Sequence, residues 1–235
     1  MAFERALVAF AHPDDAEFLC GGTVAQWVRE GTDVVYVCAT DGSAGWNGPD
    51  RSREEIARIR EEEMREAASV LGVTDVAFLG YTDGSLEPNL ELRRAVTRHV
   101  RRARPNVLVT FDPSKLWFGR SYINHPDHRA IGQAVLDVVV CDAPTRPQFP
   151  DLVDEGLEPF SVPELWLATE PSDADARVDI GETMDLKMKA IRAHRSQLEN
   201  MGDTDWDARI REWGSAAAEG GMEFAEPFRT FRLEA

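Results

Sequence analysis

The sequence of 235 residues has few cysteines, no long apolar run and a shortage of basic residues. Its three cysteines (Cys20, Cys38 and Cys141) form no CxxC pair and are too few for a disulfide framework. No run of 18 apolar residues is present, and charges interrupt the N-terminal stretch MAFERALVAFAHPDD. These absences argue against a membrane-spanning helix and a signal peptide. We therefore expect a soluble cytoplasmic protein with no membrane insertion.

Acidic residues dominate the charge of the chain. There are 42 Asp and Glu against 26 Lys and Arg, a formal net charge of −16. This balance disfavours a protein that binds nucleic acid or anionic membranes through bulk electrostatics. The hydrophobic content of 43% is that of a globular protein. With no internal repeat and no clear boundary, we predict a single domain over residues 1–235.

Strand-like and helix-like segments alternate along the chain. We expect strands at residues 6–10, 33–39, 76–79, 106–111 and 164–168, and helices at 16–30, 52–71, 90–103, 129–141 and 184–200. The proline-rich segment 142–163 is expected to be a loop, and the late apolar element PFRTF has no predicted place. The alternation predicts an α/β fold, a Rossmann-like three-layer sandwich whose mostly parallel sheet has strand order 3-2-1-4-5 and helices on both faces.

In this order the first and fourth strands are neighbours, and ligands bind where their carboxyl ends meet. HPDD follows the first strand, and HPDH follows the fourth strand after an irregular segment. Histidine nitrogen and carboxylate oxygen are ordinary zinc ligands, and three protein ligands with one open position define a catalytic zinc site. An alternative for HPDD is that an Asp caps the following helix. HPDH could likewise be two hydrogen-bonded surface histidines.

Taken together, the two motifs supply a complete set of groups for hydrolysis. His12, Asp15 and His128 are the predicted metal ligands, holding one zinc ion that activates a water molecule. Asp14 is then available as general base, and His125 as general acid or as the group that stabilises the oxyanion. Asp127 could orient His125. Fe²⁺ would suit the same donors, because the order of affinities does not decide which metal is loaded in the cell.

The pair AHPDDAE and HPDH resembles the PIG-L/LmbE-like family of zinc-dependent N-deacetylases, which includes N-acetylglucosaminyl-phosphatidylinositol deacetylases and the deacetylases of mycothiol and bacillithiol synthesis. The segments RIREEEMREAASVLGV, LGYTDGSL and KMKAIRAHRSQ extend the resemblance over nearly the whole chain. The resemblance implies the same metal ligands, the same base and the same role for His125 in stabilising the tetrahedral intermediate. It also implies a Rossmann-like fold.

Four further residues are candidates for contacts with substrate: Arg60, Asp83, Tyr122 and His194. Three of them have a plainer alternative. Arg60 in its Arg-x-x-Glu pattern could form a helix-surface ion pair, Asp83 could belong to an Asp-Gly turn, and His194 could have a capping or structural role. Some relatives carry a tyrosine two residues before HPDH, where this chain has Ile123, so the role of Tyr122 is open.

The expected reaction is removal of an N-acetyl group from an N-acetylglucosamine-like substrate, which releases acetate and a free amine. Two alternatives stay open: a zinc amidase for a thiol conjugate or secondary metabolite, and a non-catalytic sugar- or metal-binding module. A dinucleotide enzyme is disfavoured because no GxGxxG follows the first strand.

The expected partner is a small N-acetylated sugar or conjugate, with no nucleic acid, and a homo-oligomer is compatible with the sequence. Trp46, Trp117 and Phe118 could stack on a ligand or anchor their loops.

Overall fold

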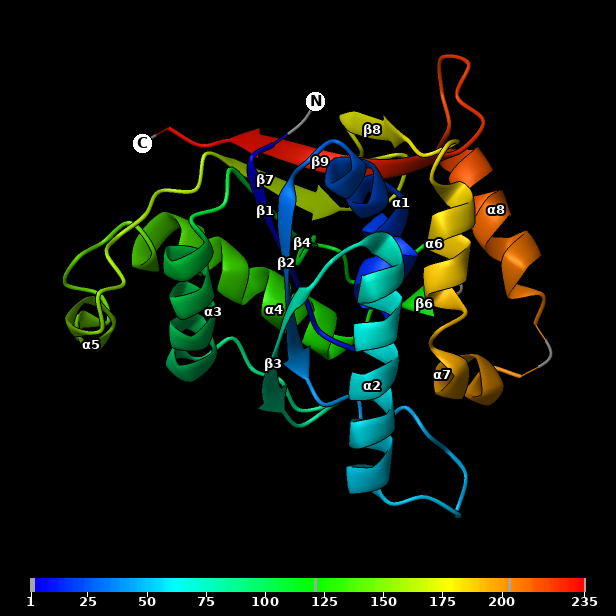
Figure 1. Ribbon diagram of the computed structural model, residues 1–235, viewed down its shortest axis with the longest axis horizontal. Helices are drawn as coiled ribbons and strands as arrows, with labels where there is room; N and C mark the ends of the chain where they lie inside the picture. Colours follow the sequence, from blue (N-terminus) through cyan, green and yellow to red (C-terminus); the bar gives the residue numbers. More distant parts are fainter. Residues whose placement is uncertain (1–2, 121, 203, 235) are drawn as a thin grey trace.

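The computed structural model describes residues 3–120, 122–202 and 204–234, and its centre is a β-sheet with helices on both sides (Figure 1). Seven strands form this sheet in the order β3-β2-β1-β4-β7-β9-β8. Their bounds are β1 (Arg5–Phe10), β2 (Asp33–Thr40), β3 (Asp75–Tyr81), β4 (Val107–Phe111), β7 (Glu164–Ala168), β8 (Ala176–Asp179) and β9 (Ala225–Arg232). A separate hairpin pairs β5 (Trp117–Phe118) with β6 (Tyr122–Ile123).

The strands from β3 to β7 are parallel, whereas β9 runs antiparallel to both β7 and β8. The predicted α/β class and mostly parallel sheet are therefore confirmed. The order 3-2-1-4-5 also holds for the five predicted strands, and the sheet continues beyond them through β9 and β8. PFRTF belongs to β9, which makes the last apolar segment of the chain part of the main sheet.

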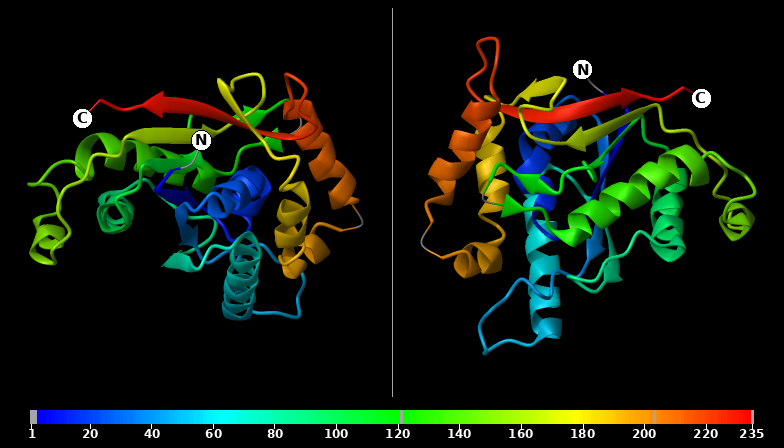
Figure 2. Two further views of the ribbon diagram at one scale, coloured as in Figure 1. Left: turned by 45° about the horizontal axis from the view of Figure 1, so that its top comes forward. Right: turned by 180° about the vertical axis from the view of Figure 1, so that it is seen from behind.

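Helices cover both faces of the sheet (Figure 2). Their bounds are α1 (Asp15–Arg29), α2 (Arg53–Leu71), α3 (Leu90–Ala103), α4 (Pro126–Asp137), the π-helical turn η1 (Val138–Asp142), α5 (Pro150–Asp154), α6 (Met184–Ile191), α7 (Arg195–Asn200) and α8 (Trp206–Ala217). α1, α2 and α6 pack together over one face, and α3 and α4 cover the other. Among the described residues, no helix combines the length and apolar composition needed to cross a bilayer.

Three segments differ from the sequence-based expectation. The helix expected at 129–141 begins earlier, because Pro126 occupies its first turn, and ends in η1. The helix expected at 184–200 is divided into α6 and α7, because the chain at His194 leaves the helical conformation and buries that side chain. The segment 142–163 is not entirely loop, since Pro150 starts the short helix α5.

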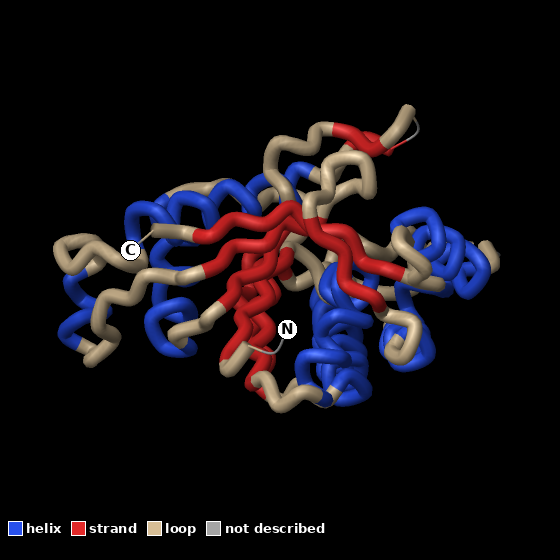
Figure 3. Tube along the Cα trace, turned by 90° about the horizontal axis from the view of Figure 1, so that it is seen from above, coloured by secondary structure: helices blue, strands red, loops and turns tan. Residues whose placement is uncertain are grey.

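The adjacent strands β1 and β4 bring the two motifs to one edge of the sheet. Ala6, Leu7 and Val8 of β1 pair in register with residues 107–109 of β4, so both strands deliver their carboxyl ends side by side. Phe10 and Phe111, the last residues of the two strands, pack edge to face with ring centroids 4.8 Å apart. Figure 3 shows the β5–β6 hairpin standing apart from the main sheet.

Candidate metal centre

A closed turn after β1 positions His12 and Asp15. Asp15 is the first residue of α1, and its Oδ2 accepts a hydrogen bond of 2.7 Å from the backbone amide of His12. Between them Asp14 has a φ of 135°, a conformation that costs a non-glycine residue about 1–3 kcal/mol. The side chain of Asp14 makes no capping hydrogen bond to α1. The capping alternative is therefore wrong for Asp14.

Three potential ligand atoms converge where this turn meets the start of α4. We call His12, Asp15 and His128 the donor cluster. His12 Nδ1 lies 3.1 Å from His128 Nε2 and 3.4 Å from Asp15 Oδ2, and His128 Nε2 lies 3.3 Å from Asp15 Oδ1. Tetrahedral zinc with ligands at 2.0–2.2 Å requires ligand atoms about 3.3–3.6 Å apart. The two distances to Asp15 fall within this range, and the two histidine nitrogens lie slightly closer together.

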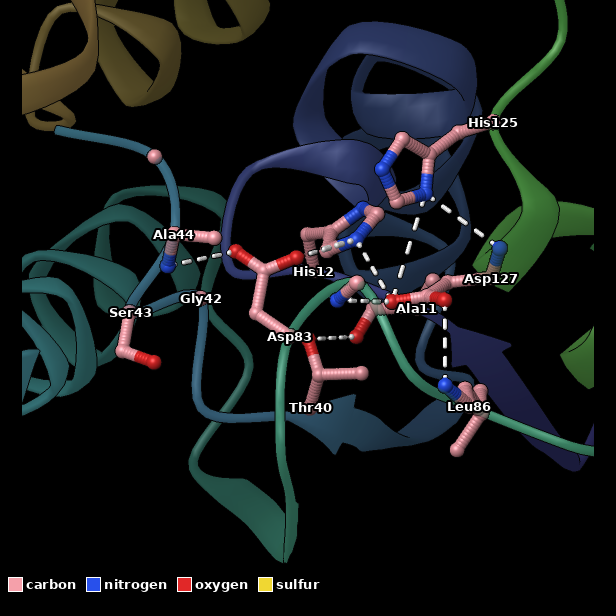
Figure 4. Close-up of polar contacts among 12 residues, drawn as sticks. Ala11, His12, Thr40, Gly42, Ser43, Ala44, Asp83, Leu86, His125 and Asp127 are labelled. Carbon is pink, nitrogen blue, oxygen red and sulfur yellow. Dashed lines mark hydrogen bonds and ion pairs between the residues drawn. The ribbon is translucent and has the colours of Figure 1, made fainter. Parts of the chain in front are cut away.

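The far side of the His12 ring faces two carboxylates. His12 Nε2 lies 3.2 Å from Asp83 Oδ1 and 3.4 Å from Asp127 Oδ2 (Figure 4). Two negative groups hold a proton on Nε2, which leaves the Nδ1 lone pair facing the donor cluster. Burial lowers the pKa of His12, but the negative charge of Asp15 and hydrogen bonds that the ring donates to Asp127, Asp15 and Asp83 raise it well above its ordinary value. The surrounding carboxylates therefore favour positive charge on the ring of His12.

Asn124 fixes the other histidine of the donor cluster. The Oδ1 atom of Asn124 lies 2.9 Å from His128 Nδ1, so the ring nitrogen donates to the amide oxygen and the Nε2 lone pair faces the cluster. The ring of His128 stacks on Phe111, with centroids 4.0 Å apart and planes 9° from parallel. His12 Nδ1 and His128 Nε2 thus face one another across 3.1 Å, a contact that a shared proton or a bound cation would satisfy.

Backbone amides of two loops hold the outer carboxylates. Asp127 accepts from the amide of Gly84 (2.8 Å). Figure 4 shows that Asp127 also accepts from the amide of Leu86 (3.1 Å) and that Asp83 accepts from the amide of Ala44 (3.0 Å). Burial raises the pKa of both carboxyl groups, but the hydrogen bond from His12 and the other donors lower it below the ordinary value. Gly84 has a φ of 88°, so Asp83 belongs to an Asp-Gly turn and also flanks His12.

Arg60 is buried beneath Asp14. Its guanidinium is 3% exposed and donates to Asp14 Oδ2 (3.1 Å), to the carbonyl of Pro13 (2.7 Å) and to the carbonyl of Gly42 (2.7 Å). A Cβ at Gly42 would lie 2.7 Å from Arg60 Nη1, so the loop after β2 can approach only because it has glycine there. The helix-surface alternative is wrong, because Arg60 and Glu63 are both buried and Glu63 binds Ser196.

The two catalytic candidates beside the donor cluster have different environments. Burial raises the pKa of Asp14, and the charge of Arg60 opposes that rise. His125 Nδ1 accepts a 3.2 Å hydrogen bond from the amide of Asp127, which places the ring proton on Nε2. Burial and the neighbouring charge of His12 lower the pKa of His125. Asp127 Oδ2 lies 4.0 Å from His125 Nδ1, farther than from His12.

The two remaining candidates lie in contrasting places. His194 is fully buried, with its Nε2 atom 3.1 Å from Glu17 Oε2, and it makes no side-chain capping bond to α7. The capping alternative for His194 is therefore wrong, whereas its burial against Glu17 is consistent with the structural alternative. Tyr122 lies on the hairpin, is 49% exposed and packs near Phe118 at a centroid distance of 5.9 Å. Burial and the charge of Asp15 raise the pKa of its hydroxyl.

Sequence reasoning missed Asn124 and Glu17. Asn124 directly precedes HPDH, and its position next to a predicted ligand was the available signal. Glu17 lies in the first turn of α1, where an acidic residue is ordinary. Potential ligand atoms of His12, His125 and His128 also lie within 4.8 Å of one another, as do those of His12, Asp83, His125 and Asp127. His125 therefore borders the same space as the donor cluster.

Comparisons with known proteins identify a family for this chain. Residues 7–139 match the family described as PIG-L: GlcNAc-PI de-N-acetylase. Diacetylchitobiose deacetylase of Thermococcus kodakarensis is 31% identical over 210 residues, which cover 88% of this chain and 75% of the relative. A probable N-acetyl-α-D-glucosaminyl L-malate deacetylase 2 of Bacillus cereus is 32% identical over 215 residues, 89% of this chain and 90% of that protein.

A solved structure matches almost the whole chain. The N,N'-diacetylchitobiose deacetylase from Pyrococcus horikoshii, complexed with its inhibitor MPG, superposes with a TM-score of 0.85 at 32% identity. The match covers 98% of this chain and 84% of that one. The shared fold therefore includes both motifs and the strands that carry them.

Proposed function

Since this chain belongs to the PIG-L family of GlcNAc-PI de-N-acetylases, we propose that it removes the acetyl group from a small N-acetylglucosamine-containing substrate. The amide C–N bond breaks, and the products are acetate and a free amine. The relatives named above are deacetylases of N-acetylated sugars and conjugates, which supports this class of substrate.

The donor cluster is the proposed site of one zinc ion. The observation that carries this proposal is the convergence of two histidine lone pairs and one carboxylate within 3.1–3.4 Å of one another. Such a ligand set needs fixed ring orientations. Asp83 and Asp127 orient the ring of His12, and Asn124 orients the ring of His128. Burial raises the pKa of Asp15, but the charges of His128 and His12 lower it, so the carboxylate is ionised and ready to bind.

Zinc bound here would lower the pKa of a water molecule towards about 7 and polarise the acetyl carbonyl. Asp14 acts as the general base that takes a proton from the attacking water and passes it to the leaving nitrogen. Arg60 holds Oδ2 of this carboxylate, and no described residue donates to Oδ1, which is left to carry the proton. The raised pKa of Asp14 suits a group that must both accept and release a proton.

His125 is the proposed partner of the developing oxyanion. The amide of Asp127 occupies Nδ1, so the Nε2 proton is available for donation towards the substrate. The lowered pKa of His125 keeps the ring neutral at pH 7, with a single proton at the donating nitrogen. Asp127 positions His12 through its carboxylate and His125 through its backbone amide.

Amine release by the zinc-reconstituted protein tests the proposal. Asp14→Asn should lower kcat by about 100-fold or more, since general bases contribute roughly 10²–10⁴-fold. His128→Ala should also abolish tight zinc binding, measured by competition with a chelator. Asp33→Asn is the matched control, because Asp33 is exposed at the start of β2, at the other end of the sheet. Full activity of Asp14→Asn or of His128→Ala would refute the assigned roles.

A further inference from the structure

The segment 194–197, which reads HRSQ, joins α6 to α7 and is largely buried. The chain leaves the helical conformation at His194, and the residues His194, Ser196 and Gln197 are 0%, 3% and 6% exposed. α7 then packs beside α2, the helix that carries Arg60 (Figure 1). The hydrogen bonds of these three residues run to three separate elements, and each of these elements supports Asp14.

His194 binds the first turn of α1. Its Nε2 atom lies 3.1 Å from Glu17 Oε2, and both side chains are fully buried. The backbone amide of Glu17 donates to the carbonyl of Asp14 (3.1 Å). The contact between His194 and Glu17 therefore ties the segment 194–197 to the turn on which Asp14 lies.

Ser196 binds α2 one turn beyond Arg60. Its backbone amide and its hydroxyl donate to the two carboxylate oxygens of Glu63, at 2.9 and 2.7 Å. Residues three apart lie on the same side of a helix. The two hydrogen bonds to Glu63 therefore fix the side of α2 from which Arg60 reaches Asp14.

Gln197 binds the loop after β2. Its Nε2 donates to the carbonyl of Gly45 (3.0 Å), and the amide of Gly45 donates to the carbonyl of Gly42 (3.1 Å). The same carbonyl of Gly42 accepts from Arg60 (2.7 Å). A Cβ at Gly45 would lie 2.5 Å from Arg60 Nη1 and 2.8 Å from Gln197 Nε2, so both groups pack closely against this glycine. Gln197 thus holds the loop that encloses the guanidinium of Arg60.

The backbone of Asp14 makes this support necessary. Its φ of 135° is a conformation that non-glycine residues rarely adopt and that persists only where surrounding contacts hold it. Arg60 supplies such contacts by donating to Asp14 Oδ2 and to the carbonyl of Pro13. Because a displacement of about 1 Å can lower a reaction rate about 100-fold, the placement of Arg60 bears directly on the rate.

We infer that His194, Ser196 and Gln197 form a positioning clamp for the proposed general base. Ser196 and Gln197 hold Arg60 in place, and Arg60 orients Asp14. His194 fixes the turn that carries Asp14, a role behind the base instead of a contact with substrate. The inference rests on the proposed deacetylase function. It adds three residues that set the rate through Arg60 and Asp14 rather than through the metal.

The first experiment measures amine release from N-acetylglucosamine and N,N'-diacetylchitobiose by Gln197→Met and Ser196→Ala, which remove hydrogen bonds with little change in volume. The kcat is expressed per bound zinc, so that unfolded protein does not contribute. We expect each variant to lower kcat about tenfold, with KM within about twofold and zinc affinity within about threefold of the wild-type values.

Thr32→Val is the matched control. It removes one side-chain donor to a backbone carbonyl, that of Phe3 (2.7 Å), just before β2 at the other end of the sheet, and it should leave kcat unchanged. Wild-type kcat in both Gln197→Met and Ser196→Ala would overturn the clamp and leave the deacetylase proposal intact. If the wild-type protein releases no amine from either sugar, the proposed function fails and the inference fails with it.

The second experiment separates positioning from a general loss of stability by repeating Gln197→Met in an Arg60→Ala background. If Gln197 acts through Arg60, the second substitution should lower kcat by less than about twofold, because residues that act as a unit are not additive. A structural defect independent of Arg60 would lower kcat by the same factor in both backgrounds. That additive result would overturn the inference.

Discussion

Asn124 offers the sharpest test of how the fold prepares the proposed zinc site. The side chain is 1% exposed and makes two hydrogen bonds in opposite directions, one to His128 and one to the carbonyl of Lys115. Asn124→Ala removes both bonds. His128 then loses the acceptor that fixes its ring, and the carbonyl of Lys115 loses its donor.

The two losses have separate magnitudes. Removing the partner of a ligating histidine typically weakens metal binding 10–100-fold, which is about 1.4–2.7 kcal/mol. Leaving a partly buried carbonyl without its donor costs about 0.5–1.5 kcal/mol of folding stability, with or without metal. At a fixed excess of zinc, a 100-fold weaker affinity also removes about 2.7 kcal/mol of zinc-dependent stabilisation. The variant should therefore be less stable without metal and should gain much less from zinc.

Asn124→Asp separates these effects, because the carboxylate still accepts from His128 but cannot donate to the carbonyl of Lys115. We expect zinc affinity to be retained and the metal-free stability to fall. Chelator competition gives the affinity, and urea unfolding with and without zinc gives the stability. Asn89→Ala is the control: it removes the cap of α3, costs about 1 kcal/mol and should leave zinc binding unchanged. Wild-type zinc affinity in Asn124→Ala would refute the reasoning.

Three further predictions concern buried charges. Arg60→Lys keeps the charge but loses the guanidinium fork, so kcat should fall about 10–100-fold with KM nearly constant in steady-state kinetics; a raised KM alone would contradict this. Lys187→Met leaves the buried carboxylate of Glu226 without its 2.6 Å partner and should lower the free energy of unfolding by about 3–5 kcal/mol; an unchanged denaturation midpoint would contradict this. Burial lowers the pKa of His194, but Glu17 outweighs it and raises the pKa. The loss of stability caused by His194→Gln should therefore be largest below about pH 6.5 and should shrink as the pH rises through the pKa of His194 in the folded protein. Equal losses in thermal unfolding at pH 6 and pH 9 would argue against the ion pair of His194 with Glu17.

Much of the fold was predictable because it depends on local sequence patterns. The apolar run ALVAF predicts a buried parallel strand, and β1 has that burial because helices cover both faces of the sheet. Helix α3 has the predicted bounds, since Asn89 caps its start and the pattern of apolar residues defines its buried side. Segments whose position depends on contacts between residues distant in sequence were harder to predict. β9 joins the sheet only through pairing with β7 and β8, and nothing in PFRTF itself indicates those partners.

The sequence alone determined the residues that could react. HPDD and HPDH each contain their reactive side chains within four residues. The predicted strand order places the two motifs at the same edge of the sheet. The tertiary structure decided how those residues are held and which neighbours complete them. Arg60 looked like a surface residue on a charged helix, but packing of α2 against the loop after β2 buries it under Asp14. Asn124 became a partner of His128 only because the hairpin folds back on it. Reactive groups follow from residue type and local spacing, whereas their orientation depends on contacts that the chain makes only when it closes on itself.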